Sequence, residues 1–136
     1  MDISSALDYL RANHHSVLIT RRVNGDPAPS PVVHGVDDHD RVVVSTREPA
    51  YKVRNLRRDP RATLCAFSDK FFGKWLTIDG RAEIISLPEA MDGLVALYRQ
   101  IAGEHPDWDD YRQAMERERR VIVAITPERA GPGRQA

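Results

Sequence analysis

The sequence predicts a mainly antiparallel β-barrel carrying short helices. Several short runs rich in Val, Ile and Thr are separated by turn signals such as Asn24-Gly25-Asp26, which is typical of hairpin-connected strands. The spacing between these runs is too short for repeated strand–helix–strand units, which favours antiparallel pairing. Helical periodicity is confined to a few short segments. The length of 136 residues fits a single domain spanning 1–136, with a loose Gly/Pro-rich tail at about 129–136.

The strands are expected where β-branched residues cluster or where apolar and polar residues alternate. In chain order they are 16–23, 32–36, 41–46, 61–68, 75–85 and 120–125. Pro27, Pro29 and Pro31 precede the second strand and cannot donate to a central ladder, so this stretch is expected to be an edge or a loop. In 75–85, residues 76, 78, 80, 82 and 84 share the apolar face.

Four helical segments are expected between the strands: 4–13, 49–58, one beginning at Ser86, and 109–117. Ser4 or Ser5 can cap the first, and Pro49 suits the first position of the second, which must end by Asp59 because Pro60 follows. Ser86-Leu87-Pro88-Glu89 fits a capping box, and residues 90, 94, 97 and 101 form an apolar stripe after it.

The charges balance overall, with 20 Lys and Arg against 20 Asp and Glu. A nucleic-acid-binding protein usually has a basic excess, so we expect no nucleic-acid partner. No 18-residue apolar run predicts a membrane span, and the N-terminus lacks the features of a signal peptide. A single cysteine, Cys65, excludes an intrachain disulfide, and its apolar neighbours favour an inert core thiol. We therefore expect a soluble, cytoplasmic protein.

The most informative charge cluster is 52–61, with five basic residues against Asp59. It follows a strand that ends in the hydroxyls of Ser45 and Thr46, so a helix N-terminus, Lys52 and hydroxyl groups come together. Phosphate binds well in such a setting. A solvated basic helix face is an equally good interpretation of the same residues, and both stay open at this point.

Few other residues suggest a role in catalysis or in binding a metal or cofactor. Trp75 stands on the polar face of its strand, where it either covers a neighbour or a subunit interface or contacts a planar ring. The five histidines have no zinc-ligand spacing, so no metal is expected. With no nucleophile or acid–base pair in view, we expect no catalytic residue and a cofactor that carries the chemistry.

The segment Ser45–Ala62, read as S-T-R-E-P-x-x-K-x-R-N-L-R-R-D-P-R-A, resembles the pyridoxamine 5′-phosphate oxidase-like split β-barrel family. Together with the segment Ala96–Met115 and the pair Arg119-Arg120, it is similar to the actinobacterial branch that uses the deazaflavin coenzyme F420. The resemblance runs from about residue 15 to 125. It implies a homodimer with cofactor in two grooves at the dimer interface.

The resemblance also implies roles for individual residues. Ser45 and Lys52 would hold the phosphate, with Thr46 and Arg47 beside them. Asn55 is added to this set because it lies three residues after Lys52, on the same face of the predicted helix. The remaining residues would meet the ring system or reach it from the other subunit: Pro27, Ala28, Pro29, Ser30, Trp75, Arg119 and Arg120. Tyr51 and the segment 71–74 depart from the pattern of the relatives.

The implied activity is hydride transfer from reduced F420 to an electron-poor small molecule. Three alternatives remain from the sequence: an FMN-dependent enzyme of the same barrel, a non-catalytic cofactor-binding protein and, ranked last, a nucleic-acid module using 52–61.

Overall fold

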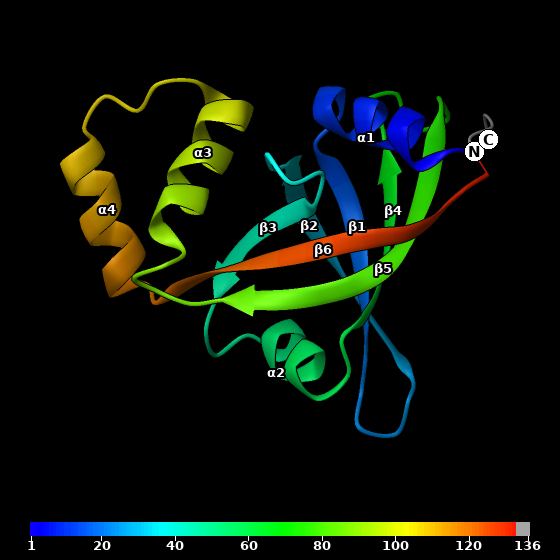
Figure 1. The fold of residues 1–136 in the computed structure, drawn as a ribbon, viewed down its shortest axis with the longest axis horizontal. Helices are drawn as coiled ribbons and strands as arrows, with labels where there is room; N and C mark the ends of the chain where they lie inside the picture. Colours follow the sequence, from blue (N-terminus) through cyan, green and yellow to red (C-terminus); the bar gives the residue numbers. More distant parts are fainter. Residues whose placement is uncertain (133–136) are drawn as a thin grey trace.

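A computed structural model describes residues 1–132 and shows six strands closed into one antiparallel barrel (Figure 1). The elements are α1 (Ile3–Ala12), β1 (His15–Arg21), β2 (Pro27–Val36), β3 (Val42–Arg47), α2 (Tyr51–Arg58), β4 (Arg61–Phe67), β5 (Trp75–Ile85), α3 (Met91–Ala102), α4 (Trp108–Arg117) and β6 (Arg120–Gly131). Around the barrel the strands follow the order β1-β2-β3-β6-β5-β4. The predicted mainly β architecture is confirmed. No helix among the described residues is long and apolar enough to cross a membrane.

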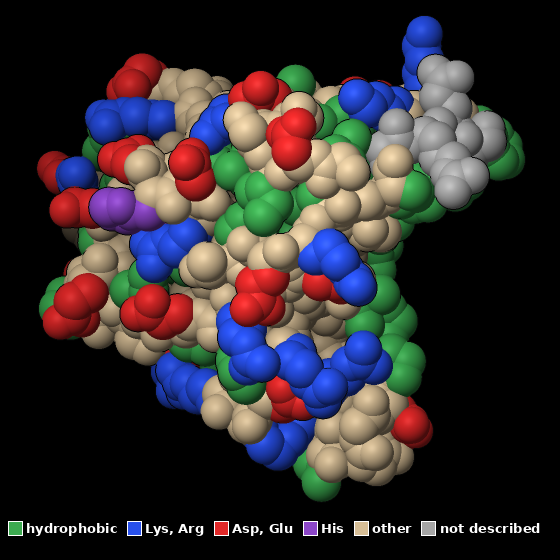
Figure 2. All heavy atoms as spheres, turned by 45° about the vertical axis from the view of Figure 1, so that its right-hand side comes forward, with side chains coloured by type: hydrophobic (Ala, Val, Ile, Leu, Met, Phe, Trp, Pro, Cys, Tyr) green, Lys and Arg blue, Asp and Glu red, His purple; other side chains and the backbone are tan. Residues whose placement is uncertain are grey.

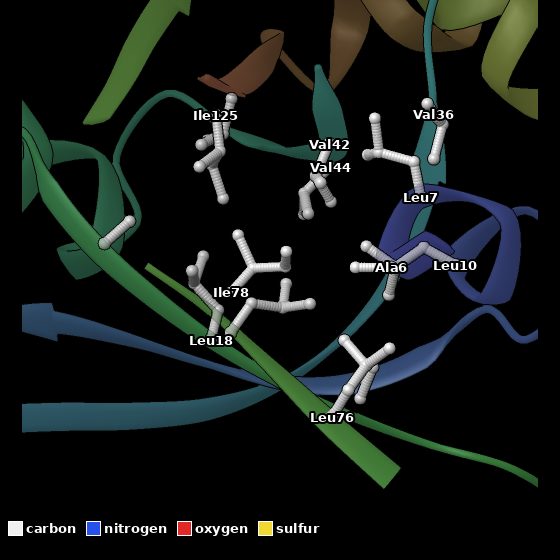
Figure 3. Close-up of a cluster of buried hydrophobic side chains, with 14 of the residues drawn as sticks. Ala6, Leu7, Leu10, Leu18, Val36, Val42, Val44, Leu76, Ile78 and Ile125 are labelled. Carbon is white, nitrogen blue, oxygen red and sulfur yellow. The ribbon is translucent and has the colours of Figure 1, made fainter. Parts of the chain in front are cut away.

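The inside of the barrel is filled by alternate residues of every strand, and α1 and α2 contribute further side chains to it. Leu7 and Leu10 of α1 lie in one buried cluster with Leu18 and Ile78 (Figure 3), and Leu56 of α2 belongs to the same cluster. These side chains are almost fully buried, which removes a large apolar area from water. The two helices therefore belong to the core, and α2 is held in a fixed place relative to the sheet.

The α3–α4 hairpin packs on the outside of β3 and β6, where it forms a second core with Val43, Ile122 and Ala124. The Gln100 side chain fixes α3 to β2 by accepting a hydrogen bond from the Val36 amide and donating one to the Val36 carbonyl, both at 2.8 Å. This approach requires a glycine beneath it, since a Cβ on Gly35 would lie 2.7 Å from Gln100 Oε1.

The outer face of β1, β4 and residues 27–33 of β2 carries partly exposed and exposed side chains, whereas α3 packs on β2 at Gly35 and Val36. Strand register places Val17 between Pro31 and Cys65 on this face, with Ile19 between Pro29 and Thr63. Val17 and Ile19 are half-buried and belong to neither core cluster. From residue 27 to 33, β2 pairs only with β1, so this part of β2 has one unpaired edge, although the barrel is closed by the pairing of residues 34–36 with β3.

The unpaired edge shows whether the proline-rich stretch is an edge strand or a loop, which the sequence left undecided. It is an edge strand, and β2 begins at Pro27 rather than at residue 32. The amide of His34 faces β1, where it donates to the carbonyl of His14, so by alternation the three proline nitrogens face away from β1. Their missing N–H groups remove no ladder hydrogen bond.

Several predicted boundaries are corrected by the structure. Pro49 precedes α2, whose N-cap is Ala50, although α2 does end before Asp59 as predicted. Asp2 caps α1 in place of Ser4 or Ser5 by accepting from the Ser5 amide. The predicted capping box at Ser86 does not form, because residues 87–90 make a turn and α3 starts at Met91.

Three further expectations differ from the structure: two residues are less buried than predicted, and part of the expected loose tail belongs to a strand. Ile101 is 37% exposed at the end of the α3 stripe. Cys65 points to the outer face of β4 and is half-buried rather than in the core, while burial raises the pKa of its thiol as expected for an inert cysteine. Residues 129–131 of the expected loose tail are the end of β6 and pair with β5, and the tail from 133 onward lies outside the described residues.

Candidate functional site

A cavity of about 710 Å³ lies between the β1–β2 hairpin and the N-terminus of α2. We call it the α2 pocket. The residues that line it are Thr20, Arg22, Val23, Asn24, Ala28, Pro29, Ser30, Ala50, Tyr51, Lys52 and Asn55. It therefore joins five of the residues proposed from the sequence (28, 29, 30, 52 and 55) that come from two separate segments of the chain. Its volume is in the range of small-molecule and cofactor sites.

The N-terminus of α2 opens into this pocket without a side-chain cap. Ala50 is the N-cap and has no side chain that could accept a hydrogen bond. The amides of Val53 and Arg54 donate to the carbonyl of Ala50, whereas those of Tyr51 and Lys52 donate no hydrogen bond within the described residues. Free amides at the positive end of a helix favour an anion.

Lys52 adds a full positive charge beside these amides. Desolvation by burial lowers the pKa of Lys52, and the positive charge of Arg120 lowers it further. Both effects disfavour the charged form, and an anion bound beside the ammonium group would reverse them. A negatively charged ligand group beside Lys52 would therefore stabilise the charged form of its side chain.

Hydrogen bonds between α2 and β1, one of them buried, hold the pocket wall in place. Asn55 donates from Nδ2 to Thr20 Oγ1 at 3.1 Å, which ties α2 to β1 across 35 residues of sequence. Asn55 also accepts from Arg58 at 2.8 Å, and Arg58 donates to the carbonyl of Arg21 at 2.7 Å. Asn55 is buried, so the structure assigns it a hydrogen-bonding role in the wall in addition to lining the pocket.

The residues proposed from β3, Ser45, Thr46 and Arg47, do not line the α2 pocket. Arg47 pairs across the sheet with Arg120, and Ser45 and Thr46 pair with Ile122 and Val121. Thr46 is buried, whereas Ser45 is partly exposed. Arg119 and Arg120 line a smaller cavity of about 240 Å³ with Glu48. Arg120 is nevertheless close enough to act on the pKa of Lys52.

Trp75 and Pro27 do not line the α2 pocket. Trp75 pairs with Phe67, which pairs with His15 at the start of β1, whereas the pocket surrounds the end of β1. At about 3.3 Å per residue, the five residues from His15 to Thr20 place Trp75 roughly 15 Å or more away along the strand. Pro27 is exposed beside the pocket at the start of β2.

Six residues that line the pocket were not among the site residues proposed from the sequence: Thr20, Arg22, Val23, Asn24, Ala50 and Tyr51. The Asn24-Gly25 turn signal could have located the hairpin, but its proximity to α2 follows from barrel closure. In Figure 2 a group of Lys and Arg side chains covers the lower part of the molecule, where α2 lies in Figure 1. The overall charge balance therefore conceals a positive region around this site.

Residues 5–132 match the pyridoxamine 5′-phosphate oxidase family. The chain belongs to this family. The six-stranded antiparallel barrel with its four helices is consistent with the FMN-binding split barrel of the family.

Solved structures with the same fold include proteins of different description. A conserved hypothetical protein from Mycobacterium tuberculosis is 25% identical, with a TM-score of 0.77 over 96% of this chain and 82% of that chain. An F420 reductase is 18% identical, with a TM-score of 0.67 over 88% and 90%. HutZ, the heme storage protein from Vibrio cholerae, is 17% identical, with a TM-score of 0.72 over 98% and 96%. Proteins with this fold are thus described by more than one cofactor, and the fold alone does not choose between them.

Proposed function

We propose that this protein is an F420-dependent oxidoreductase that reduces an electron-poor small molecule. The observation that carries the proposal is the α2 pocket, in which an uncapped helix N-terminus and Lys52 face a cavity of about 710 Å³. Such a donor set fits the phosphate of a flavin or deazaflavin. The choice of F420 over FMN is supported by the resemblance of Ser45–Ala62 and Ala96–Met115 to the F420 branch.

The residues of the chain would bind and orient the cofactor. Lys52 and the amides of Tyr51 and Lys52 would hold the phosphate, and the β2 segment from Ala28 to Ser30 would lie along the ring system. When bound, F420 supplies a hydride equivalent from its reduced ring. The protein supplies orientation and exclusion of water, which lower the entropic part of the barrier. No side chain of the pocket is required as a catalytic residue, and solvent can provide the proton.

A second copy of the chain is the partner that fits this function. The outer face of β1, β2 and β4 exposes Val33 and the prolines of β2, and the β4–β5 loop exposes Phe71 and Phe72 at 70% and 77%. Large exposed apolar areas of this kind mark interaction surfaces. In a homodimer formed through this face, Trp75, which is remote from the pocket of its own chain, would be available to the pocket of the partner.

The experiment is a titration of the purified protein with F420 and with FMN, followed by cofactor fluorescence, and then a turnover assay with reduced F420 against quinones and enones. Tight binding of F420 with turnover supports the proposal. Tight binding of FMN with no response to F420 overturns it in favour of an FMN-dependent enzyme. Binding without turnover on any acceptor supports a non-catalytic binding protein.

A heme-binding role has less support from the pocket. Among the described residues that line it, Tyr51 alone has a side chain of a type that ligates heme iron.

A further inference from the structure

A second cavity, of about 410 Å³, lies on the outside of the barrel between α3 and the β2–β3 hairpin. We call it the α3 cavity. Its walls come from three segments: residues of 36–43 around the hairpin turn, residues of 85–90 between β5 and α3, and residues of 92–100 on α3. It shares no lining residue with the α2 pocket. Its volume and its three walls suit a compact small molecule.

The floor of the α3 cavity is apolar. Val43 of β3, Ile122 of β6 and Leu97 of α3 line it, and all three belong to the second core. These residues are only 2–6% exposed, so the cavity reaches down to the core instead of ending at polar surface groups. An apolar group placed against this floor would leave water, which favours its binding.

Gly93 of α3 keeps this floor open. Glycine inside a helix is destabilising relative to alanine, so its presence needs a reason. Gly35 has a steric one, because a Cβ there would lie 2.6 Å from Leu97 Cδ1. Gly93 has no such reason: its φ is not positive, and a Cβ there would lie 3.5 Å from Ile122 Cγ1, an ordinary contact. The missing methyl group leaves Ile122 uncovered within the cavity.

The rim of the α3 cavity is acidic. Three of the lining residues are exposed carboxylates: Asp38, Glu89 and Asp92. Within residues 1–132 no ion pair neutralises them. Arg41, the arginine of the lining, is already paired with Asp37 at 2.9 Å and with Glu83 at 3.5 Å. The positive end of α3 offsets about half of one charge. His39 is the remaining titratable group, and the rim keeps an excess of negative charge.

These carboxylates have no capping role and form no metal site in the part of the chain that the structure describes. The N-cap of α3 is Ala90, and no side chain caps the helix. Residues 1–132 hold no group of three or more His, Cys, Asp or Glu side chains placed to bind a metal ion. A carboxylate rim above an apolar floor is complementary to a positive charge on an apolar body.

From this arrangement we infer that the α3 cavity binds a small organic cation, an ammonium or guanidinium group carried on an apolar body. The apolar body lies against Val43 and Ile122, and the cation lies between Glu89 and Asp92. The inference goes beyond the proposed function and does not depend on which cofactor the α2 pocket binds. Because the rim is exposed, its contribution is modest and sensitive to salt, and the floor supplies the rest.

The test is a titration of the purified protein with three probes of equal chain length, hexylamine, 1-hexanol and hexanoate, followed by the amide signals in ¹H–¹⁵N NMR spectra. Hexylamine is expected to cause saturable shifts at Val43 and Gly93 and none at Tyr51 or Lys52. Hexanol is expected to bind about fivefold more weakly and hexanoate not at all. Addition of 0.5 M NaCl should narrow the difference between hexylamine and hexanol.

Variants separate the rim from the floor. Glu89→Gln combined with Asp92→Asn should weaken hexylamine about five- to tenfold and leave hexanol unchanged. Gly93→Leu fills the space above Ile122 and should remove binding of both. If it does not fold, Gly93→Ala, whose methyl group makes only ordinary contacts, should weaken both about threefold. Asp109→Asn, which removes the same charge from the first turn of α4, is the matched control and should change nothing.

Three results overturn the inference: hexanoate that binds as tightly as hexylamine, hexylamine that causes no shift at the α3 cavity, and unchanged hexylamine affinity in the rim variant or in a folded Gly93 variant. Each leaves the proposed function standing, because the cofactor titration concerns the α2 pocket alone.

Discussion

The buried histidine of β2 makes the stability of the fold depend on pH in a way that can be measured. The side chain of His34 is fully buried, its Nδ1 lies 2.8 Å from Ser16 Oγ, and its Nε2 has no hydrogen-bond partner in the described residues. Burial lowers the pKa of His34 from its ordinary value of 6.5 to about 4. The native protein therefore holds this imidazole neutral, whereas the unfolded chain binds a proton below about pH 6.5.

The sign and size of the effect follow from proton linkage. Above pH 6.5 the group is neutral in both states and contributes no pH dependence. As pH falls toward 4, the unfolded state gains a proton that the native state does not, so the free energy of unfolding decreases. A difference of about 2.5 pKa units at 1.36 kcal/mol per unit amounts to about 3 kcal/mol once pH lies below 4.

The assay is urea unfolding at a series of pH values for the native protein and for His34→Gln. Glutamine can still bond to Ser16 but does not titrate, so the difference between the two proteins isolates His34 from the other acid-sensitive groups. We expect the native protein to lose about 3 kcal/mol more than the variant between about pH 7 and pH 4. Parallel pH profiles would refute the argument that His34 is buried in its neutral form.

Three other predictions concern the pocket, the sheet and the outer face. Lys52→Ala should weaken cofactor binding by on the order of 1.5–3 kcal/mol, the cost of one charge-assisted contact, with an unchanged circular dichroism spectrum; equal affinity by fluorescence titration would remove Lys52 from the site. Gly35→Ala should lower the free energy of unfolding by about 1–3 kcal/mol, because its methyl group would crowd side chains of α3. Urea unfolding at neutral pH measures this loss, and an unchanged free energy of unfolding would mean that α3 can shift to make room. Val17→Arg should convert a dimer to a monomer in light scattering, whereas Ile101→Arg on α3 should not; an unaffected oligomer would place the interface elsewhere.

The candidate site was predictable where it depends on local sequence. A strand ending in hydroxyls followed by a basic segment indicated an anion site, and Pro60 correctly limited α2 to residues before Asp59. Lys52 at the first turn followed from the same pattern. The start of α2 was misplaced, since the turn at Pro49 precedes the helix and depends on contacts outside the segment, such as the hydrogen bond from the Glu48 amide to the carbonyl of Arg119.

The sequence by itself determined the strands, their antiparallel order along the chain and the chemistry available near Lys52, because alternation, turn residues and proline act over a few neighbouring residues. The bounds of β5, Trp75–Ile85, agree with the prediction for this reason. Only the tertiary structure decided which segments meet. Closure of the barrel brings Thr20 against Asn55 and so forms the pocket, and it leaves Trp75 at the other end of the sheet. Such contacts depend on strand register and helix placement across the whole chain, which no local pattern encodes.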